Sequence, residues 1–375
     1  MSERGNNLMK FCDRYLGIPI VFMLGLIRQK KKFDKNLLKQ KDLRFLVLKT
    51  AAIGDTIVLS AVIRELKARF PSAKITLICS KSNYSAVKLI KEIDNIAIFE
   101  MSHPLKSLRV ISKLPEHDLL FDFSPWDKID AVIAYFSRTK FRIGFRRRKM
   151  SRHYIYDIAV EHQDSVHEIE NYRNLLRSVN IQPTGLIPEI SITMEKFPFI
   201  NNLLARNQPN IILHPFPGGI KKEFKEWPLD NWVKLGQKLI EENYKVFVSG
   251  GKEDFEQADY IREQIEKNGK QCSVLAGKYS LEETAAILKR SSLLVTVNTG
   301  IMHLGAAVGA KVIALHGPTS PKRWGPLCKN AVIVAPKLKC APCLSLGFEY
   351  ACKQGGCMES IEIEWVFDEC NSYLG

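Results

Sequence analysis

Apolar and polar residues follow two alternating patterns from residue 44 onward. Short apolar runs typical of buried strands are followed by segments in which apolar residues recur every three or four positions, as in amphipathic helices. The strand-like runs are Arg44–Lys49, Lys74–Cys79, Ile96–Phe99, Leu119–Phe123, Asn210–His214, Lys245–Gly250, Leu293–Val297 and Lys311–Gly317. The helix-like segments include Val58–Phe70, Leu229–Glu241 and Leu281–Lys289. This alternation predicts an α/β protein with parallel sheets.

The length of 375 residues exceeds what one hydrophobic core usually organises, so two domains are expected. The pattern is interrupted by the polar stretch Asn180–Glu189, which contains Pro and Gly, and restarts at Asn210. We predict Rossmann-like domains at residues 43–185 and 209–360, a linker region at 186–208 and a C-terminal helix at 361–375. Ligands of such sheets bind at the carboxyl ends of the strands, and two facing domains would form a central cleft.

The N-terminal segment, residues 1–42, has a separate character. Its uncharged stretch Tyr15–Ile27 is shorter than the ~20 residues needed to cross a bilayer. A basic cluster at residues 28–32 follows the apolar stretch, and no cleavage site intervenes, which argues against a signal peptide. Such a segment can lie in the interface of an anionic leaflet. We predict peripheral membrane attachment, and the alternative is a helix packed on the first domain with solvated lysines.

Composition narrows the choice of partners. The 46% hydrophobic and 25% charged residues are typical of a globular protein, and the net charge of +15 favours an anionic partner. No zinc-finger or RNP motif is present, so nucleic-acid binding rests on charge alone and is a minor alternative; we expect no nucleic-acid partner. The chain has nine cysteines, which is an odd number, and five of them are scattered along the sequence. This cysteine usage is consistent with a reducing cytoplasm.

The first candidate site is the loop Lys49–Asp55, which leaves a strand and opens a helix. Gly54 permits a close turn, and Asp55 lies near the helix start, where an Asp is more often an N-cap than a catalytic group. The loop matches neither the GxGxxG fingerprint nor the Walker A motif, so dehydrogenase and P-loop functions lose support.

Three loops of the second domain carry the remaining candidates. After the strand at 210–214, Gly218 and Gly219 allow a backbone to approach phosphate and Lys225 adds charge, although a solvated basic loop is an alternative. Glu253 could accept hydrogen bonds from sugar hydroxyls or serve as a helix-start acid. The third loop would cap a helix whose N-terminus forms an anion site; its candidates are Asn298, Thr299, Gly300 and His303.

Together these segments resemble the heptosyltransferase family, glycosyltransferase family 9. The resemblance covers residues 43–361 and is carried by LKTAAIGDTIVLSAVIREL, ILHPFPGGIKKEFKEWP, GGKED, GKYSLEETAAIL and NTGIMHLGAAVGAKVIALHGPTSP. It implies the GT-B architecture, with an acceptor-binding N-terminal domain and a nucleotide-sugar-binding C-terminal domain. It also implies inverting, metal-independent transfer from ADP-heptose to a lipopolysaccharide core or a related surface glycan at the cytoplasmic face of the inner membrane.

The resemblance also assigns roles to residues. Asp55 matches the catalytic base, Lys225 the phosphate-binding lysine and Glu253 the acid of the nucleotide domain, while His303 lies in the TG-x-x-H stretch. Asn298 stands where the family usually has Asp, which leaves open a donor other than ADP-heptose. It also leaves open a catalytically weak protein that binds sugar nucleotides.

Two further clusters have open interpretations. A basic tract in the acceptor domain could recognise an anionic, lipid-linked glycan, or it could be a solvated loop; its candidates are Arg142, Arg146, Arg147 and Arg148. Near the C-terminus, Cys340, Cys343, Cys352 and Cys357 have a spacing that could hold a structural zinc, with reduced thiols or labile disulfides as alternatives. No cofactor is required by the expected chemistry.

Overall fold

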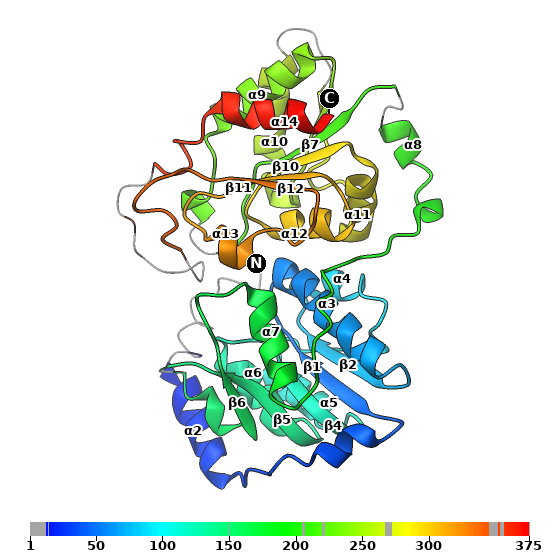
Figure 1. Cartoon of the computed structure of the whole chain (residues 1–375), viewed down its shortest axis with the longest axis vertical. Helices are drawn as coiled ribbons and strands as arrows, with labels where there is room; N and C mark the ends of the chain where they lie inside the picture. The colour runs from blue at the N-terminus through cyan, green and yellow to red at the C-terminus, as the bar shows by residue number, and fades with distance from the viewer. Residues whose placement is uncertain are drawn as a thin grey trace. The chain divides into compact units, whose positions relative to one another are not determined.

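The computed structural model describes residues 13, 15–148, 150–204, 207–219, 222–266, 272–344, 352 and 356–374. Its contacts divide the chain into two compact units, Met1–Leu186 (unit 1) and Ile187–Gly375 (unit 2). Each unit contains a parallel sheet covered by helices (Figure 1). The predicted α/β class with two parallel sheets is therefore confirmed.

The described part of unit 1 contains six parallel strands in the order β3-β2-β1-β4-β5-β6. The strands are β1 (Arg44–Leu48), β2 (Lys74–Cys79), β3 (Asn95–Ile98), β4 (His117–Asp122), β5 (Thr139–Arg146) and β6 (Ile158–Glu161). The order changes direction between β1 and β4, which are the central pair. Loops diverge at such a switch point, and ligands bind there in doubly wound sheets. The loops that begin at Lys49 and Phe123 start at this point.

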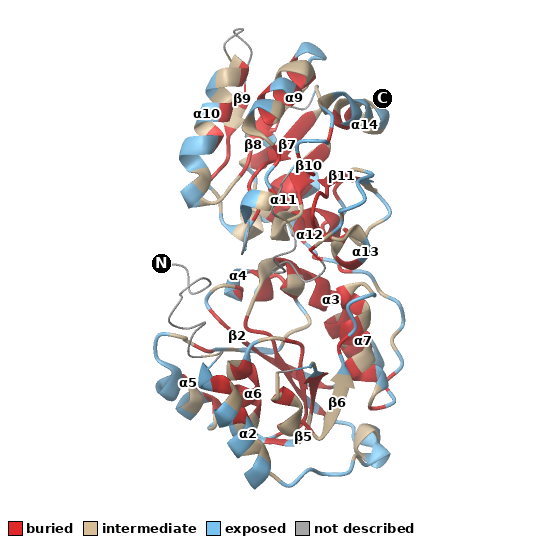
Figure 2. Cartoon of the chain, turned by 90° about the vertical axis from the view of Figure 1, so that its left-hand side faces the viewer, coloured by how far each residue is buried: buried red, intermediate tan, exposed pale blue. Residues whose placement is uncertain are grey.

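Helices of unit 1 form two layers. One layer contains α3 (Ile53–Arg69), α4 (Tyr84–Val87) and α7 (Glu168–Arg177), and the other contains α2 (Gly17–Ile27), α5 (Pro104–Ile111) and α6 (Lys128–Phe136). Right-handed crossovers that run in opposite directions from the switch point place them on opposite faces of the sheet (Figure 2). Short 3-10 helices η1 (Lys35–Lys39) and η2 (Arg152–Tyr154) complete the unit.

Unit 2 repeats this architecture, with strand order β12-β11-β10-β7-β8-β9 among its described residues. The strands are β7 (Asn210–His214), β8 (Lys245–Val248), β9 (Cys272–Val274), β10 (Leu293–Val297), β11 (Val312–Leu315) and β12 (Ala331–Val334). The helices are η3 (Met194–Lys196), α8 (Ile200–Leu203), η4 (Lys222–Phe224), α9 (Leu229–Glu241), η5 (Lys252–Asp254), α10 (Phe255–Glu266), α11 (Leu281–Arg290), α12 (Gly300–Ala307), α13 (Pro321–Trp324) and α14 (Ile363–Leu374). Because β10, β7 and β8 are neighbours, the loops after them begin side by side.

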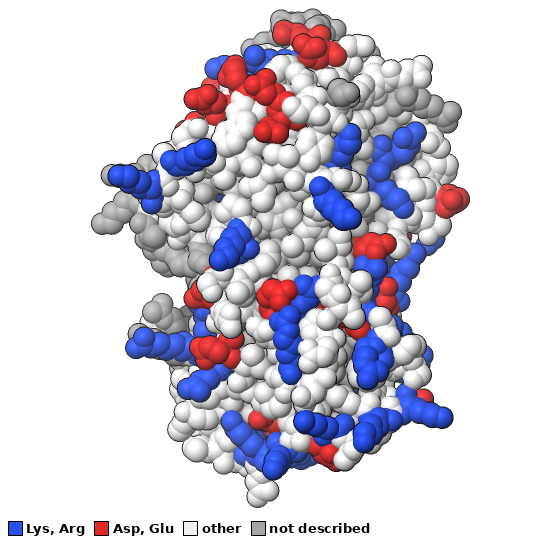
Figure 3. All heavy atoms as spheres, in the orientation of Figure 1, with Lys and Arg blue, Asp and Glu red and all other residues white. Residues whose placement is uncertain are grey.

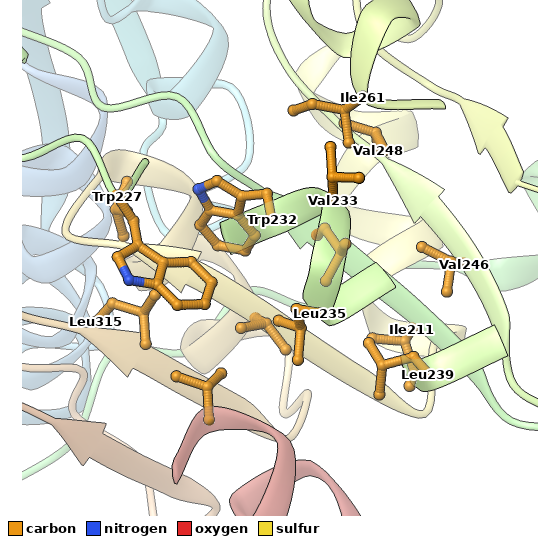
Figure 4. Close-up of a cluster of buried hydrophobic side chains, with 14 of the residues drawn as sticks. Ile211, Trp227, Trp232, Val233, Leu235, Leu239, Val246, Val248, Ile261 and Leu315 are labelled. Atoms are coloured by element: carbon orange, nitrogen blue, oxygen red, sulfur yellow. The ribbon is translucent and has the colours of Figure 1, made fainter. Parts of the chain in front are cut away.

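A pair of tryptophans anchors the core of unit 2 (Figure 4). The rings of Trp227 and Trp232 meet edge to face, with centroids 5.0 Å apart and an interplanar angle of 85°. The indole N–H of Trp227 donates to the carbonyl of Ile361 at 3.0 Å, just before α14. This core joins the loop before α9 to the C-terminal helix.

The N-terminal segment contains α2, which packs on α6 and η2. Val21 is fully buried in this contact. Among the described residues, no helix has both the length and the hydropathy needed to cross a membrane.

Candidate functional site

Asp55 lies in the first turn of α3, at the carboxyl end of β1. Ala52 is the N-cap residue of this helix, so Asp55 is not its N-cap. The Asp55 side chain is 21% exposed and remains accessible to a ligand. The helix therefore presents a carboxylate that it does not use to cap its own N-terminus.

Lys49 accompanies Asp55 from the other end of the same loop. Its Nζ lies 3.5 Å from Oδ2 of Asp55, donates to the carbonyl of Phe123 at 3.2 Å, and sits 5.3 Å from the ring centroid of Tyr172. The lysine side chain is only 4% exposed. The Asp55 carboxylate thus lies next to the ammonium group of Lys49, which is held in place by the carbonyl of the residue after β4.

Two residues that the sequence did not single out hold this loop. Asn83, in the loop after β2, donates through Nδ2 to the carbonyl of Lys49 and to Oγ1 of Thr56, both at 2.9 Å. Thr50 donates through Oγ1 to Oδ1 of Asp130 at 2.7 Å, and both side chains are buried. The backbone on either side of the Asp55 turn is therefore tied to β2 and α6.

The basic tract proves to be heterogeneous. Arg142 lies in strand β5, so the alternative of a solvated loop does not hold for this residue. Its guanidinium donates to four backbone carbonyls around the end of α6, those of Ala134, Tyr135, Ser137 and Thr139. Burial lowers the pKa of Arg142 to about 10. This arrangement is structural and gives no support to acceptor binding by Arg142.

The other arginines of the tract differ in their surroundings. Arg147 pairs with Asp164 at 2.7 Å and stacks on Trp126, 3.8 Å from the ring centroid. Arg146 and Arg148 are exposed. These two side chains keep their guanidinium groups at the surface of unit 1.

Arg152, further along, is buried against the carboxylate of Asp122. Its NH2 donates to Oδ2 of Asp122 at 2.6 Å, and the hydroxyl of Tyr156 donates to the same oxygen at 2.5 Å. Arg152 also donates to the carbonyl of Ser124. This ion pair braces the chain just after β4, close to the Asp55 loop.

In unit 2, Lys225 stands beside the glycine loop that follows β7. Its Nζ donates to the carbonyl of Gly218 at 2.7 Å. Gly219 has a φ of 87°, in the left-handed region that favours glycine, and a Cβ on Gly218 would meet nothing within 4 Å. Among the described residues, the loop therefore leaves space next to a lysine, as a phosphate site requires.

Glu253 follows β8 within η5, and its side chain is exposed. The neighbouring Asp254, not Glu253, accepts the backbone N–H of Gly251 at 2.8 Å. The role of helix-start acid thus falls to Asp254. The Glu253 carboxylate is left at the carboxyl edge of the sheet.

The loop after β10 leads into α12. Thr299 is its N-cap residue and accepts the N–H of Ile301 at 2.9 Å, as the sequence predicts. Asn298 instead donates through Nδ2 to the carbonyl of Trp324 at 3.2 Å. Gly300 opens the helix, and His303, one turn later, is buried. The structure thus brings the predicted residues after β7, β8 and β10 to one edge of the sheet.

The end of β7 is joined to the end of β8 at this edge. Nδ1 of His214 lies 3.0 Å from Oγ of Ser249. Burial lowers the pKa of His214 to about 4, so the imidazole is neutral at physiological pH. This buried pair supports the loops without adding charge to them.

The cysteines near the C-terminus do not support the predicted structural zinc. Within the described residues, no group of three or more His, Cys, Asp or Glu side chains is placed to hold a metal ion. Cys340, Cys343, Cys352 and Cys357 are free thiols. Burial raises the pKa of Cys357 to about 11, with further contributions from Cys343 and Cys352.

The architecture defines the class of protein. The chain superposes on the E. coli ADP-heptose lps heptosyltransferase II with a TM-score of 0.72 and 22% identity, covering 88% of this chain and 98% of that one. A family 9 glycosyl transferase from Veillonella parvula superposes with a TM-score of 0.73 and 19% identity, covering 89% of this chain and 98% of that one. The fold is thus the GT-B fold of glycosyltransferases.

The sequence identifies the family. Residues 129–353 match the sequence model of glycosyltransferase family 9 (heptosyltransferase), and the chain belongs to this family. It is a glycosyltransferase. Among its relatives, lipooligosaccharide heptosyltransferase 2 of Haemophilus influenzae is 24% identical over 310 residues, covering 78% of this chain and 88% of the relative. Lipopolysaccharide heptosyltransferase 2 of E. coli is 22% identical over 306 residues, with the same shares covered.

Proposed function

We propose that this enzyme transfers a heptose from ADP-heptose to a lipopolysaccharide core or a related surface glycan, with inversion and without a metal. The observation that carries the proposal is the accessible Asp55 carboxylate beside the buried Lys49. Support comes from relatives named lipooligosaccharide or lipopolysaccharide heptosyltransferases, and from the similar fold of E. coli heptosyltransferase WaaC with ADP, at a TM-score of 0.68 and 17% identity.

In this mechanism Asp55 acts as the general base. Its carboxylate takes the proton of the acceptor hydroxyl while that oxygen forms a bond to the anomeric carbon of the donor. The bond between the anomeric carbon and the diphosphate oxygen breaks on the opposite face, and the nucleoside diphosphate leaves with the bonding electrons. One displacement inverts the anomeric centre, and the proton on Asp55 then passes to solvent.

The leaving diphosphate needs positive charge and hydrogen-bond donors that are already in place. Lys225 supplies an ammonium group held at the glycine loop by the Gly218 carbonyl. The first turn of α12, after Thr299 and Gly300, supplies backbone N–H groups and the positive end of the helix dipole. Glu253 is assigned to the hydroxyl groups of the nucleotide sugar.

Asn298 bears on the identity of the donor. Its side-chain amide is oriented by the Trp324 carbonyl, so the residue is a neutral hydrogen-bonding group at this edge. A donor with a different sugar is the alternative that this observation favours. A protein that binds the nucleotide sugar without transferring it is the second alternative.

We further propose that the acceptor is lipid-linked and anionic and that the enzyme works at the cytoplasmic face of the inner membrane. Arg146 and Arg148 are exposed, and Arg146 is paired only at the surface, with Glu161 at 4.0 Å, so both could contact the phosphates and carboxylates of such a glycan.

A donor screen tests the proposal. The purified enzyme is given ADP-heptose, other ADP-sugars, and UDP- and GDP-hexoses in turn, with a lipid-linked core extract as acceptor, and released nucleoside diphosphate is measured. We expect release with ADP-heptose and lipid acceptor together. Turnover with a hexose donor but none with ADP-heptose would reject the assigned donor. Donor binding by calorimetry without any transfer would favour the binding protein.

A further inference from the structure

Helix α2 is apolar on all sides, yet only one side of it is buried. Gly17 and Val21 face the protein. A second stripe, which we call the outer stripe, lies away from this contact and is between 45% and 73% exposed; its residues are Leu16, Ile20, Met23 and Ile27. These four residues are spaced four, three and four apart, so they lie on one face of the helix. A helix that is hydrophobic all round is normally buried all round. Within the described part of the chain, no segment buries the outer stripe.

The orientation of α2 is fixed by contacts at both ends of the helix. A Cβ on Gly17 would come within 2.9 Å of Cβ of Lys128, and one on Gly25 within 2.4 Å of Cβ of Tyr154. The ring of Phe22 meets Tyr154 edge to face at 5.3 Å. Just after the helix, Arg28 forms an ion pair with Asp157 at 2.6 Å. The helix is therefore docked on unit 1 with its outer stripe held outward.

Cations follow the apolar stripe directly. Lys30, Lys31 and Lys32 are exposed, and Nζ of Lys30 donates to the carbonyl of His153. The pKa of His153 is lowered by burial and then by the charges of Arg146 and Lys30. Figure 3 shows Lys and Arg side chains over the lower end of unit 1, where the chain continues from α2 towards η1.

Helix α5 extends the same surface. It packs on α6, which also carries α2, so the three helices share one layer (Figure 2). Leu105 is 81% exposed and Val110 53% exposed. The basic side chains of Lys106 and Arg109 are exposed beside them. The exposed face of α5 thus carries both apolar and basic side chains. The same combination occurs along α2 and the basic segment that follows it.

We propose that the outer face of α2, with the exposed part of α5, docks on an anionic phospholipid bilayer. The apolar stripe of α2 inserts at the level of the headgroups, and Lys30, Lys31 and Lys32 pair with lipid phosphates. Charge selects the bilayer over a second copy of this chain, because a two-fold contact through α2 would bring the lysine clusters of both copies together. The proposal of this surface depends on the proposed function in one respect, because binding to the bilayer would bring the enzyme to a lipid-linked acceptor.

Vesicle sedimentation tests the surface. The full chain is mixed with vesicles of phosphatidylglycerol and phosphatidylethanolamine, and with vesicles of phosphatidylcholine alone. The test variant is Ile20→Gln/Met23→Gln/Ile27→Gln, which changes only exposed side chains. The control changes three large hydrophobic residues of unit 2 that are 40% to 45% exposed, as Phe255→Gln/Tyr260→Gln/Ile333→Gln.

We expect the parent chain and the control to bind anionic vesicles and the α2 variant to bind at least about tenfold more weakly, because three inserted side chains are lost. Lys30→Gln/Lys32→Gln should weaken binding to anionic vesicles, while Lys234→Gln/Lys339→Gln in unit 2 should not. Parental binding by the α2 variant, equal binding to phosphatidylcholine, or no vesicle binding by the parent would overturn the surface. So would a concentration-dependent dimer that the α2 variant abolishes.

Turnover on a delipidated, water-soluble core acceptor separates this proposal from the proposed function. The α2 variant should retain parental turnover on the soluble acceptor and lose turnover on acceptor embedded in vesicles. Transfer by a parent chain that does not bind vesicles would reject the surface and leave the function standing. Vesicle binding through α2 without transfer to either acceptor would reject the function and leave the surface standing.

Discussion

Replacing Asp130 with Asn should stabilise unit 1, and the gain should grow with pH. Asp130 is fully buried; its Oδ1 accepts from Thr50, and its Oδ2 has no hydrogen-bond partner among the described residues. Burial, followed by the charges of Asp122 and Asp127, raises the pKa of Asp130 to about 8. An Asn keeps the acceptor for Thr50 and carries no proton to lose.

The magnitude follows from proton linkage. Between the ordinary Asp pKa of 3.8 and about 8, the folded chain holds a proton on Asp130 that the unfolded chain has released. The free energy of unfolding therefore falls as pH rises through this window, by about 1.4 kcal/mol per pH unit for one proton. From pH 5 to pH 7 this amounts to about 3 kcal/mol as an upper bound. Asp130→Asn removes this decline.

The assay is native-state hydrogen exchange of peptides from β1 and β4, measured at pH 5, 6, 7 and 8 and corrected for intrinsic exchange. The matched control is Asp94→Asn. Burial raises the pKa of Asp94, but hydrogen bonds from Ile75, Lys67 and Lys74 outweigh it and hold the pKa at about 2. The contribution of Asp94 to the free energy of unfolding is lost only as pH falls below about 3.8. Asp94→Asn should therefore lower the free energy of unfolding by the same amount at every pH tested. A pH-independent difference for Asp130→Asn, or a loss of stability at pH 7, would refute the reasoning.

Three further substitutions address the site and the core. Asp55→Asn should lower the rate of transfer by about 10² to 10⁴-fold and leave the donor Kd unchanged in calorimetry. The control Asp368→Asn, at an exposed position, should change neither quantity. A large loss of donor affinity in Asp55→Asn would contradict the role of base. Lys225→Met should raise the donor Kd about 10- to 100-fold, because a charged hydrogen bond is lost, while the control Lys234→Met on α9 should leave the Kd unchanged. If Lys225→Met and the parent enzyme bind the donor equally well, Lys225 is not part of the phosphate site. Trp232→Ala should lower the free energy of unfolding of unit 2 by about 3–5 kcal/mol in urea titration, and a cost below 1 kcal/mol would show that the pair with Trp227 is not central.

Buried strands could be predicted closely from the sequence. The ranges expected for β2, β7 and β10 coincide with those observed, and α9 has the predicted bounds Leu229–Glu241. Strands covered on both faces are continuous apolar runs, and their ends coincide with polar or glycine-containing turns. Helix α3 begins at Ile53, five residues before the predicted start, because Ala52 and not a residue of the apolar repeat is its N-cap.

Strand β5 was missed although a signal was present. Its residues Phe141, Ile143 and Phe145 are buried, and Arg142 and Arg146 alternate with them. Alternation of this kind is the mark of a strand. The arginines instead favoured the interpretation as a basic tract, because charge alone cannot show that the guanidinium of Arg142 is used by backbone carbonyls at the end of α6.

The candidate residues of the two units differ in how far their supporting contacts reach along the chain. In unit 2, Lys225 is seven residues from the Gly218 carbonyl and Thr299 is two from Ile301, so a local motif contains both partners. In unit 1, the loop before Asp55 is held by contacts that span 34, 74 and 80 residues, from Asn83, Phe123 and Asp130. Those partners meet only because β1 lies between β2 and β4, and no sequence motif encodes that order. The proposed base is therefore positioned by the topology of its sheet, whereas the proposed donor-binding groups are positioned by the loops that carry them.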